Sequence, residues 1–347
     1  MRKLLYGSSV LALLCFIQIF YTPVMTNAAT PTIANVSGTV QNGQILTVTG
    51  SNMMNENVGN WDSFFSSHSN AYGFEGSSPS SDFYCDLGPC SGAYDTTVKL
   101  SGSKSIKFHT AGSHSSNQMS YNAFTPASSG ARWYRFYTRW HANSWPDSWM
   151  KMFYLMGGAT NNFYFEPYAN GGSNPSQMIV QVTNNNNVTI PTGPLQNDRW
   201  YLFEVYATGS NYQIWMDGTQ IFNGSNGSFG TQSWLFGIVN ECCSSNGSFD
   251  YSMWIDNMAT SSSRIYPSSL VEISNSATYG SGTIVYQEPV YLSDGSVQIK
   301  ANLSGLGSGP YYLWVTNNSQ TRSSAYLLSG GGTASSTPLP PTIIYVQ

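Results

Sequence analysis

The segment ARWYRFYTRWHA, residues 131–142, holds the side chains best suited to chemistry. Successive side chains of a strand point to opposite faces of its sheet. One face therefore carries Trp133, Arg135, Tyr137, Arg139 and His141, and the other is more apolar. Aromatic rings can stack on the apolar faces of sugars, and guanidinium groups can bind hydroxyl or carboxylate oxygens through two hydrogen bonds. We predict that the first face lines an accessible groove, while Phe136 and Trp140 fill the interior.

Neighbouring strands are predicted to extend this groove. SWMKMFY contributes Lys151, FYFEPYA contributes Tyr164 and Glu166, and QMIVQV contributes Gln181. The predicted glycan-binding set is Trp133, Arg135, Tyr137, Arg139, His141, Lys151, Glu166 and Gln181. The alternative is a solvated outer face, on which the arginines pair with the few acidic residues of the chain.

The elements that must position these residues are strands. WYLFEVYATGSNYQIWMDGTQIF, residues 200–222, contains two alternating runs separated by a turn signal and ended by Asp217-Gly218. FDYSMWIDNM, residues 249–258, is a further strand with acidic residues near its centre. Tryptophan-opened hairpins followed by a closing I-D-N strand resemble the concanavalin A-like (laminin-G-like) jelly roll. This resemblance implies a two-sheet fold that holds sugars on cell surfaces and in secreted enzymes.

Two further segments resemble a second family. Residues 31–53, PTIANVSGTVQNGQILTVTGSNM, contain two strands around an Asn-Gly turn and resemble the opening of an IPT/TIG immunoglobulin-like domain. Such a sandwich needs about seven strands. The run GPYYLWVTN, within residues 264–329, resembles the last hairpin of the same family. We predict an all-β chain in which an immunoglobulin-like (IPT/TIG) sandwich is interrupted by a concanavalin A-like jelly roll. Two independent short modules are the alternative.

The predicted organisation has six parts. They are a signal peptide at 1–29, the first part of the IPT/TIG-like domain at 30–53, a linker at 54–71, the jelly roll at 72–263, the second part of the IPT/TIG-like domain at 264–329, and a Gly/Ser/Pro linker with a terminal strand at 330–347. Arg2 and Lys3 before an apolar run, with TNAA after it, predict export to the medium or cell surface. An uncleaved anchor is the alternative.

The composition of the chain limits the classes of partner that it can bind. Charged residues make up 9% of the chain and aromatic residues 14%, which favours packed β-structure over disorder. The formal net charge is −4, and removal of Arg2 and Lys3 with the signal would make it −6. Because no Lys/Arg stripe is available to neutralise phosphates, we expect no nucleic-acid binding. No second apolar run of transmembrane length follows the signal, so we expect no membrane insertion of the processed chain.

Four cysteines would remain after removal of the signal. They are Cys85, Cys90, Cys242 and Cys243. An even number in an exported chain favours disulfides, with three possible connectivities. Cysteine-bound zinc is the alternative.

The jelly-roll resemblance implies a structural calcium ion. Glu75 in GFEG and Asp256 in WIDNM match the two positions at which such modules carry acidic ligands. Calcium requires oxygen ligands of this kind. A structural Ca²⁺ is the one cofactor that we predict.

Jelly-roll polysaccharide lyases neutralise a uronate with Arg or Gln and move protons with Tyr or His. The resemblance would give these roles to Arg135, Arg139, His141 and Tyr164. The alginate lyases of this fold carry Arg-x-Glu-x-Arg, however, whereas the strand here reads Arg135-Phe-Tyr-Thr-Arg139. We therefore predict non-catalytic binding of a polysaccharide or surface glycan. The alternatives are a lyase that acts on a uronate polymer, and a structural subunit that self-associates through residues 342–347.

Overall fold

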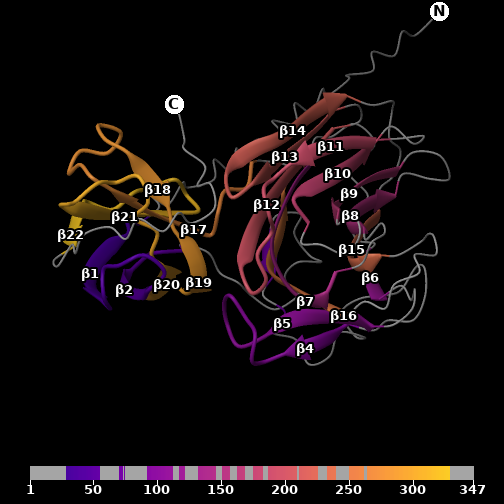
Figure 1. Cartoon of the computed structure of the whole chain (residues 1–347), viewed down its shortest axis with the longest axis horizontal. Coiled ribbons are helices and arrows are strands. Elements are labelled where there is room, and N and C mark those ends of the chain that lie inside the picture. Colours follow the sequence, from indigo (N-terminus) through magenta and orange to yellow (C-terminus); the bar gives the residue numbers. More distant parts are fainter. Residues whose placement is uncertain are drawn as a thin grey trace, which may run out of the picture.

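The computed structural model describes residues 29–54, 70–72, 74, 92–111, 117–121, 132–145, 151–156, 162–168, 175–182, 187–208, 211–225, 233–239, 250–261 and 264–328. Every regular element within these ranges is a strand, so the all-β prediction is confirmed for this part of the chain. The strands form two bodies that lie side by side (Figure 1). No helix in the described ranges is long and apolar enough to cross a membrane.

Several sequence predictions fall outside the described ranges and stay predictions. They concern the signal peptide, most of the linker at 54–71, Glu75, the four cysteines Cys85, Cys90, Cys242 and Cys243, and the terminal strand at 342–347.

The larger body is a sandwich of two antiparallel sheets. The eight-stranded sheet has the order β14 (Thr219–Ser225), β13 (Asn211–Met216), β12 (Trp200–Ala207), β7 (Arg132–Ser144), β16 (Asp250–Ser261), β5 (Ser105–Ala111) and β4 (Ala93–Asp95), with β3 (Asn70–Tyr72) paired to β16. The six-stranded sheet has the order β11 (Asn187–Pro191), β10 (Gln177–Val182), β9 (Asn162–Tyr168), β8 (Lys151–Met156), β15 (Ser233–Val239) and β6 (Asn117–Tyr121).

Aromatic side chains fill the space between these two sheets. Phe136 of β7 lies 5.7 Å from Phe153 and 5.6 Å from Phe203, measured between ring centroids, and both pairs are stacked. Trp140 packs 5.1 Å from Tyr201. The prediction that Phe136 and Trp140 face the interior is therefore confirmed. It succeeds because the two-residue period of a strand depends only on the local sequence.

The smaller body combines both ends of the described chain. One of its sheets has the order β1 (Thr32–Ser37), β2 (Ile45–Ser51), β20 (Ser296–Lys300) and β19 (Glu288–Leu292). The other has the order β18 (Ile284–Tyr286), β17 (Ser269–Ser274), β21 (Tyr311–Asn317) and β22 (Tyr326–Leu328). The β2–β20 ladder pairs Val48 with Val297. The larger sandwich thus lies between β2 and β17 in the chain. The IPT/TIG assignment of the smaller sandwich stays a prediction.

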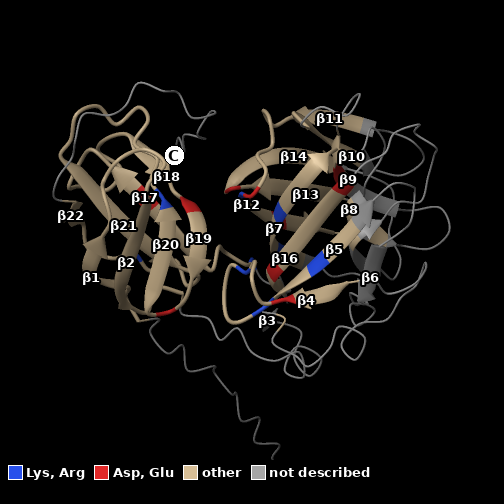
Figure 2. Cartoon of the chain, turned by 60° about the horizontal axis from the view of Figure 1, so that its bottom comes forward, with Lys and Arg blue, Asp and Glu red and all other residues tan. Residues whose placement is uncertain are grey.

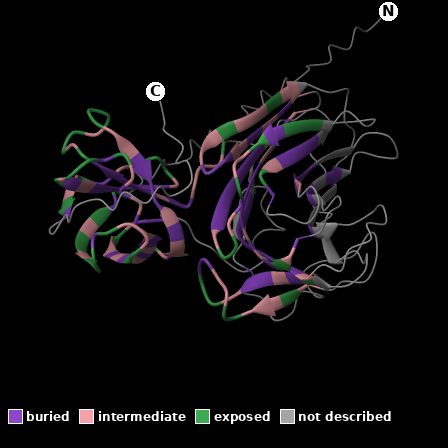
Figure 3. Ribbon diagram, viewed as in Figure 1, coloured by how far each residue is buried: buried purple, intermediate pink, exposed green. Residues whose placement is uncertain are grey.

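The core of the smaller sandwich continues onto the larger one. Val48, Ile273 and Val297 belong to the same buried cluster as Tyr137 and Trp200, which point outward from the eight-stranded sheet. Strand β12 is consequently buried along nearly its whole length (Figure 3). One part of this sheet therefore has a hydrophobic core on each of its faces.

Candidate functional site

The centre of the predicted groove on β7 is buried. Arg135 and Tyr137 are both 0% exposed. Arg135 donates hydrogen bonds to the carbonyl of Tyr266, at 3.0 Å, and to Oδ1 of Asn257, at 2.9 Å. The hydroxyl of Tyr137 accepts a hydrogen bond of 3.3 Å from the backbone N–H of Ser268. The prediction that these two residues line an accessible groove is wrong, because the chain between β16 and β17 and the smaller sandwich cover this face.

The strands predicted to extend the groove belong to the opposite sheet. Lys151, Tyr164 and Gln181 lie in β8, β9 and β10 of the six-stranded sheet, whereas β7 is in the eight-stranded one. Their side chains are outside the described part of the structure. Glu166 of β9 is buried. Packed sheets are about 10 Å apart and their outer faces point in opposite directions. No common face can therefore hold both sets.

The same topology separates the residues of the lyase alternative. Arg135 is buried under the chain that follows β16, and Tyr164 is in the other sheet. Only Arg139 and His141 remain together, at the end of β7. The structure therefore does not assemble the four residues that this alternative requires.

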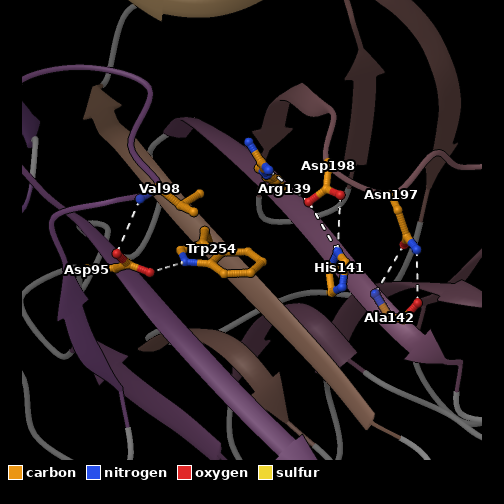
Figure 4. Close-up of polar contacts among 8 residues, drawn as sticks. All are labelled: Asp95, Val98, Arg139, His141, Ala142, Asn197, Asp198 and Trp254. Atoms are coloured by element: carbon orange, nitrogen blue, oxygen red, sulfur yellow. Dashed lines mark hydrogen bonds and ion pairs between the residues drawn. The ribbon is translucent and has the colours of Figure 1, made fainter.

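Arg139 and His141 meet at one carboxylate (Figure 4). Nη2 of Arg139 lies 2.7 Å from Oδ1 of Asp198, and Nδ1 of His141 lies 3.1 Å from Oδ2 of the same residue. Partial burial raises the pKa of Asp198, but hydrogen bonds from Arg139 and His141 outweigh this effect and hold it below its usual value. Asp198 is also in the left-handed region, with φ of 65°, which aspartate tolerates better than most residues. This group is a pairing of exposed charges rather than an open binding site.

Trp254 of β16 lies beside this ion pair (Figure 4). Its indole N–H donates a 2.8 Å hydrogen bond to Oδ2 of Asp95. The guanidinium of Arg139 lies 5.9 Å from the ring centroid, and the ammonium of Lys107 lies 5.1 Å from it. Burial raises the pKa of Asp95, but hydrogen bonds from Thr97, Trp254 and Val98 lower it to about 2, so this carboxylate stays ionised. Trp254 itself is nearly fully buried.

A cavity of about 370 Å³ opens between the two sandwiches. The larger sandwich contributes the loop 191–196, the start of β12 and the turn between β13 and β14. The smaller sandwich contributes Tyr286, Glu288 and residues 300–302. Figure 2 shows acidic residues on β19 and near β12, at the facing edges of the two sandwiches. We call this space the interdomain cavity.

Four charged side chains line the interdomain cavity. Nη2 of Arg199 lies 2.5 Å from Oδ2 of Asp217, and its guanidinium stacks 4.4 Å from the ring of Tyr201. Oε2 of Glu288 lies 3.9 Å from both Nε of Arg199 and Nζ of Lys300. The side chains of Arg199, Glu288 and Lys300 are 23%, 18% and 38% exposed. All three can therefore contact a molecule that enters.

The two carboxylates of the cavity differ in their availability. Asp217 is only 3% exposed, and its Oδ1 accepts a 2.9 Å hydrogen bond from the N–H of Leu202. Burial raises the pKa of Asp217, and the positive charge of Arg199 works against that rise. Burial also raises the pKa of Glu288, opposed by Arg199 and Lys300. Asp217 is thus fixed within the fold, whereas Glu288 has an accessible edge.

The sequence alone did not identify this cavity. Asp217 is in an Asp-Gly dipeptide, which is sufficiently explained as a turn, and its partner Arg199 precedes a strand without any motif. Glu288 and Lys300 are about 70 or more residues further along the chain, in the other sandwich. A useful signal was the predicted return of the chain to its first domain, because it brings residues after 264 next to the inserted body.

Asp256, the predicted calcium ligand, has a structural use in the described part of the chain. Its Oδ2 accepts hydrogen bonds from the N–H groups of Leu100, at 2.7 Å, and Ser101, at 2.9 Å. Its Oδ1 accepts one of 2.7 Å from the N–H of Asn257. No group of three or more His, Cys, Asp or Glu residues is placed to hold a metal ion among the described residues. Asp256 therefore anchors the loop before β5, and the calcium site stays a prediction that depends on Glu75.

We expect Asp256→Asn to lower the free energy of unfolding by about 1–3 kcal/mol, because an amide nitrogen would face a backbone donor in a buried position. Urea denaturation monitored by circular dichroism would measure the loss. We expect the same loss in excess calcium and in chelator. A larger loss in calcium than in chelator would instead identify Asp256 as a metal ligand.

Comparison with known proteins gives structural neighbours only. No protein-family model matches the chain, and no curated protein matches it. The cellulose induced protein Cip1 is 16% identical, with a TM-score of 0.43, over 57% of this chain and 99% of that one. The alginate lyase AlgAT5 from polysaccharide lyase family 7 is 9% identical, with a TM-score of 0.37, over 53% and 86% of the two chains. The alginate lyase AlyA1 from Zobellia galactanivorans is 11% identical, with a TM-score of 0.37, over 67% and 95%. Similarities this low do not determine a ligand or a reaction, which must come from the side chains.

Proposed function

We propose that this protein binds a carbohydrate in the interdomain cavity without catalysing a reaction on it. The observation that carries the proposal is the convergence of partly exposed donors and acceptors from both sandwiches on one cavity of about 370 Å³. Small-molecule sites have volumes of this order and occur preferentially between domains. The proposal includes export to the medium or cell surface, which the N-terminal sequence predicts.

The lining of the cavity favours a ligand rich in hydroxyl groups. Arg199 and Lys300 donate hydrogen bonds, Glu288 accepts them, and Gln196 and Asn302 can do both. The two cations are balanced by two carboxylates, so a strongly charged ligand would have to break an existing pair. Sugar hydroxyls both donate and accept, and they add no charge. The apolar part of the lining supplies contact surface for the C–H faces of a sugar; it includes Pro191, Pro194, Leu195 and Ile221.

The carboxylates of the cavity favour binding over hydrolysis. Glycosidases generally need two carboxyl groups that both reach the scissile bond. Of the two that line this cavity, Asp217 is buried and held by Leu202 and Arg199, so only Glu288 is accessible. One accessible carboxylate beside a lysine can orient a sugar but does not supply an acid and a nucleophile.

The proposal predicts a loss of affinity when Lys300 is changed. The chain without residues 1–29 would first be screened on an array of neutral oligosaccharides, and the affinity for the strongest binder would be measured by calorimetry. We expect Lys300→Met to weaken binding about tenfold, or roughly 1.4 kcal/mol, because it removes a donor at the mouth of the cavity. The change should have little effect on folding, since the pairing of Lys300 with Glu288 is partly solvated.

The matched control is Lys99→Met. Lys99 lies outside the cavity, on the loop after β4. Its ammonium donates a hydrogen bond to the carbonyl of Thr96. We expect this variant to bind as the unmodified chain does. Equal affinities of the Lys300→Met variant and the unmodified chain would place the ligand elsewhere, and an array without any binder would refute the proposal.

A further inference from the structure

We infer that the outer face of the eight-stranded sheet carries a second carbohydrate contact, formed by Trp133, Tyr206, Trp215 and Arg264, and that it recognises an acidic sugar. This contact, which we call the aromatic patch, does not depend on the interdomain cavity. Of the residues predicted on the face of β7, only Trp133 belongs to it.

Three rings from adjacent strands make up the patch. Trp133 of β7 is the direct cross-strand partner of Tyr206 of β12, and their ring centroids are 4.7 Å apart. Trp215 of β13 lies 5.3 Å from Trp133, with its ring tilted by 30°. All three side chains are partly exposed, unlike Arg135 and Tyr137 on the same face. The rings therefore form one partly exposed aromatic cluster, which is not part of the core shared with the smaller sandwich.

An exposed cation lies over these rings. The guanidinium carbon of Arg264 is 5.2 Å from the ring centroid of Trp133, 5.3 Å from that of Trp215 and 5.0 Å from that of Tyr266. Arg264 is exposed to solvent and forms no close ion pair with a carboxylate in the described part of the structure. Stacking on the rings restrains its side chain, although the residue is exposed to solvent.

The charges beneath the patch also favour an anion. Glu204 of β12 is 2% exposed and is the cross-strand partner of both Arg135 and Trp215. It interacts electrostatically with Arg264 and Arg135. Two arginines thus lie near one buried carboxylate. The local charge around the aromatic patch is therefore not negative, although the whole chain carries a net charge of −4. An anion approaching from solvent meets the guanidinium of Arg264 before it meets Glu204.

These features together describe a site for a negatively charged sugar. The parts of the rings that Arg264 does not cover offer apolar surface to the C–H face of a sugar ring. An exposed guanidinium binds a carboxylate, and in the same way a sulfate, through paired hydrogen bonds. A neutral sugar would use the rings and could accept single hydrogen bonds from Arg264, but it would not form the paired, charge-assisted bonds that an anionic group forms. A peptide acid would use Arg264 but would leave the flat surface uncovered.

Retention on immobilised polymers tests this inference. The probes are polygalacturonate for carboxylates, dextran sulfate for sulfates, and unmodified dextran as the neutral control. We expect the chain without residues 1–29 to be retained more strongly on at least one acidic polymer than on dextran. Retention should decrease as salt is raised, because an exposed cation is screened by ions. The polymer that retains the chain distinguishes a carboxylate from a sulfate.

Arg264→Gln should reduce retention at least fivefold, and Arg264→Lys should reduce it too, because lysine keeps the charge but not the paired donors. Lys104→Gln is the matched control, since Lys104 also lies over a ring of the same sandwich, that of Tyr94 at 5.5 Å. Lys104→Gln should not change retention. Thermal unfolding would confirm that each variant is folded. If Arg264→Gln does not fold, the retention of the Arg264→Lys variant still tests the inference.

The inference would be overturned by three results: no retention on either acidic polymer, equal retention on dextran, or unchanged retention of both Arg264 variants. Because the cavity is tested with Lys300→Met and neutral oligosaccharides, failure of one proposal leaves the other standing.

Discussion

Arg135→Met is expected to lower the free energy of unfolding by about 2–6 kcal/mol, because two acceptors lose a buried charged donor at a cost of about 1–3 kcal/mol each. The guanidinium of Arg135 is completely buried and holds Tyr266 and Asn257. Methionine fills most of the space but leaves both acceptors without these donors. It also leaves the buried Glu204 on the neighbouring strand with one cation fewer. Urea denaturation monitored by circular dichroism would measure the loss.

Arg139→Met on the same strand is the control for this experiment. The ion pair of Arg139 with Asp198 is partly exposed, and such pairs contribute about 0–1 kcal/mol. The comparison of the two variants distinguishes an accessible groove on β7 from a buried face. An arginine in an accessible groove would lose ligand affinity and little stability, whereas a buried arginine that fixes the chain between the sandwiches would do the reverse. If Arg135→Met were as stable as the unmodified chain, our description of this face would be wrong.

Glu204 should make the stability of the protein depend on pH. Burial raises the pKa of its carboxyl group from 4.5 to about 7, although Arg264 and Arg135 act in the opposite direction. The folded state therefore holds this proton more tightly than the unfolded state does. The contribution of Glu204 to stability is fully present below about pH 4.5, decreases between pH 4.5 and 7, and is constant at its lowest value above pH 7.

Glu204→Gln removes this titration and is the direct test. Relative to the variant, the unmodified chain should lose up to about 3 kcal/mol of unfolding free energy between pH 4.5 and pH 8, the free energy that corresponds to such a pKa difference. Denaturation curves of both proteins at the two pH values give the comparison, in which titrations of other groups cancel. An unchanged difference between the two proteins would show that Glu204 is already ionised at pH 4.5.

The strands and their faces could largely be predicted from the sequence. Trp133, Arg135 and Tyr137 do share one side of β7, and Phe136 and Trp140 do share the other. This follows from the two-residue period of a strand, which needs no knowledge of distant contacts. The prediction of two sheets and of an all-β chain rested on the same local signals.

Which strands share a sheet could not be predicted in this way. β7 pairs with β12 and with β16, which begins more than 100 residues later, and not with β9 or β10. The covering of Arg135 and Tyr137 also depends on a neighbour, because a face that looks polar in isolation became buried when the smaller sandwich packed on it. The pairing of Arg199 with Asp217 and Glu288 is of the same kind. The position of the candidate site therefore depends on contacts between residues far apart in the sequence, whereas the strands and their faces follow from the local sequence pattern.

Binding of a carbohydrate between the two sandwiches can be tested by hydrogen–deuterium exchange with and without the best-binding oligosaccharide from the array. We expect the ligand to slow exchange in residues 191–202 of the larger sandwich and in residues 286–302 of the smaller one, which border the interdomain cavity. Exchange in β9 and β10 should not change. Slower exchange confined to β9 and β10 would instead place the sugar on the six-stranded sheet, away from the interdomain cavity, and would refute binding in that cavity.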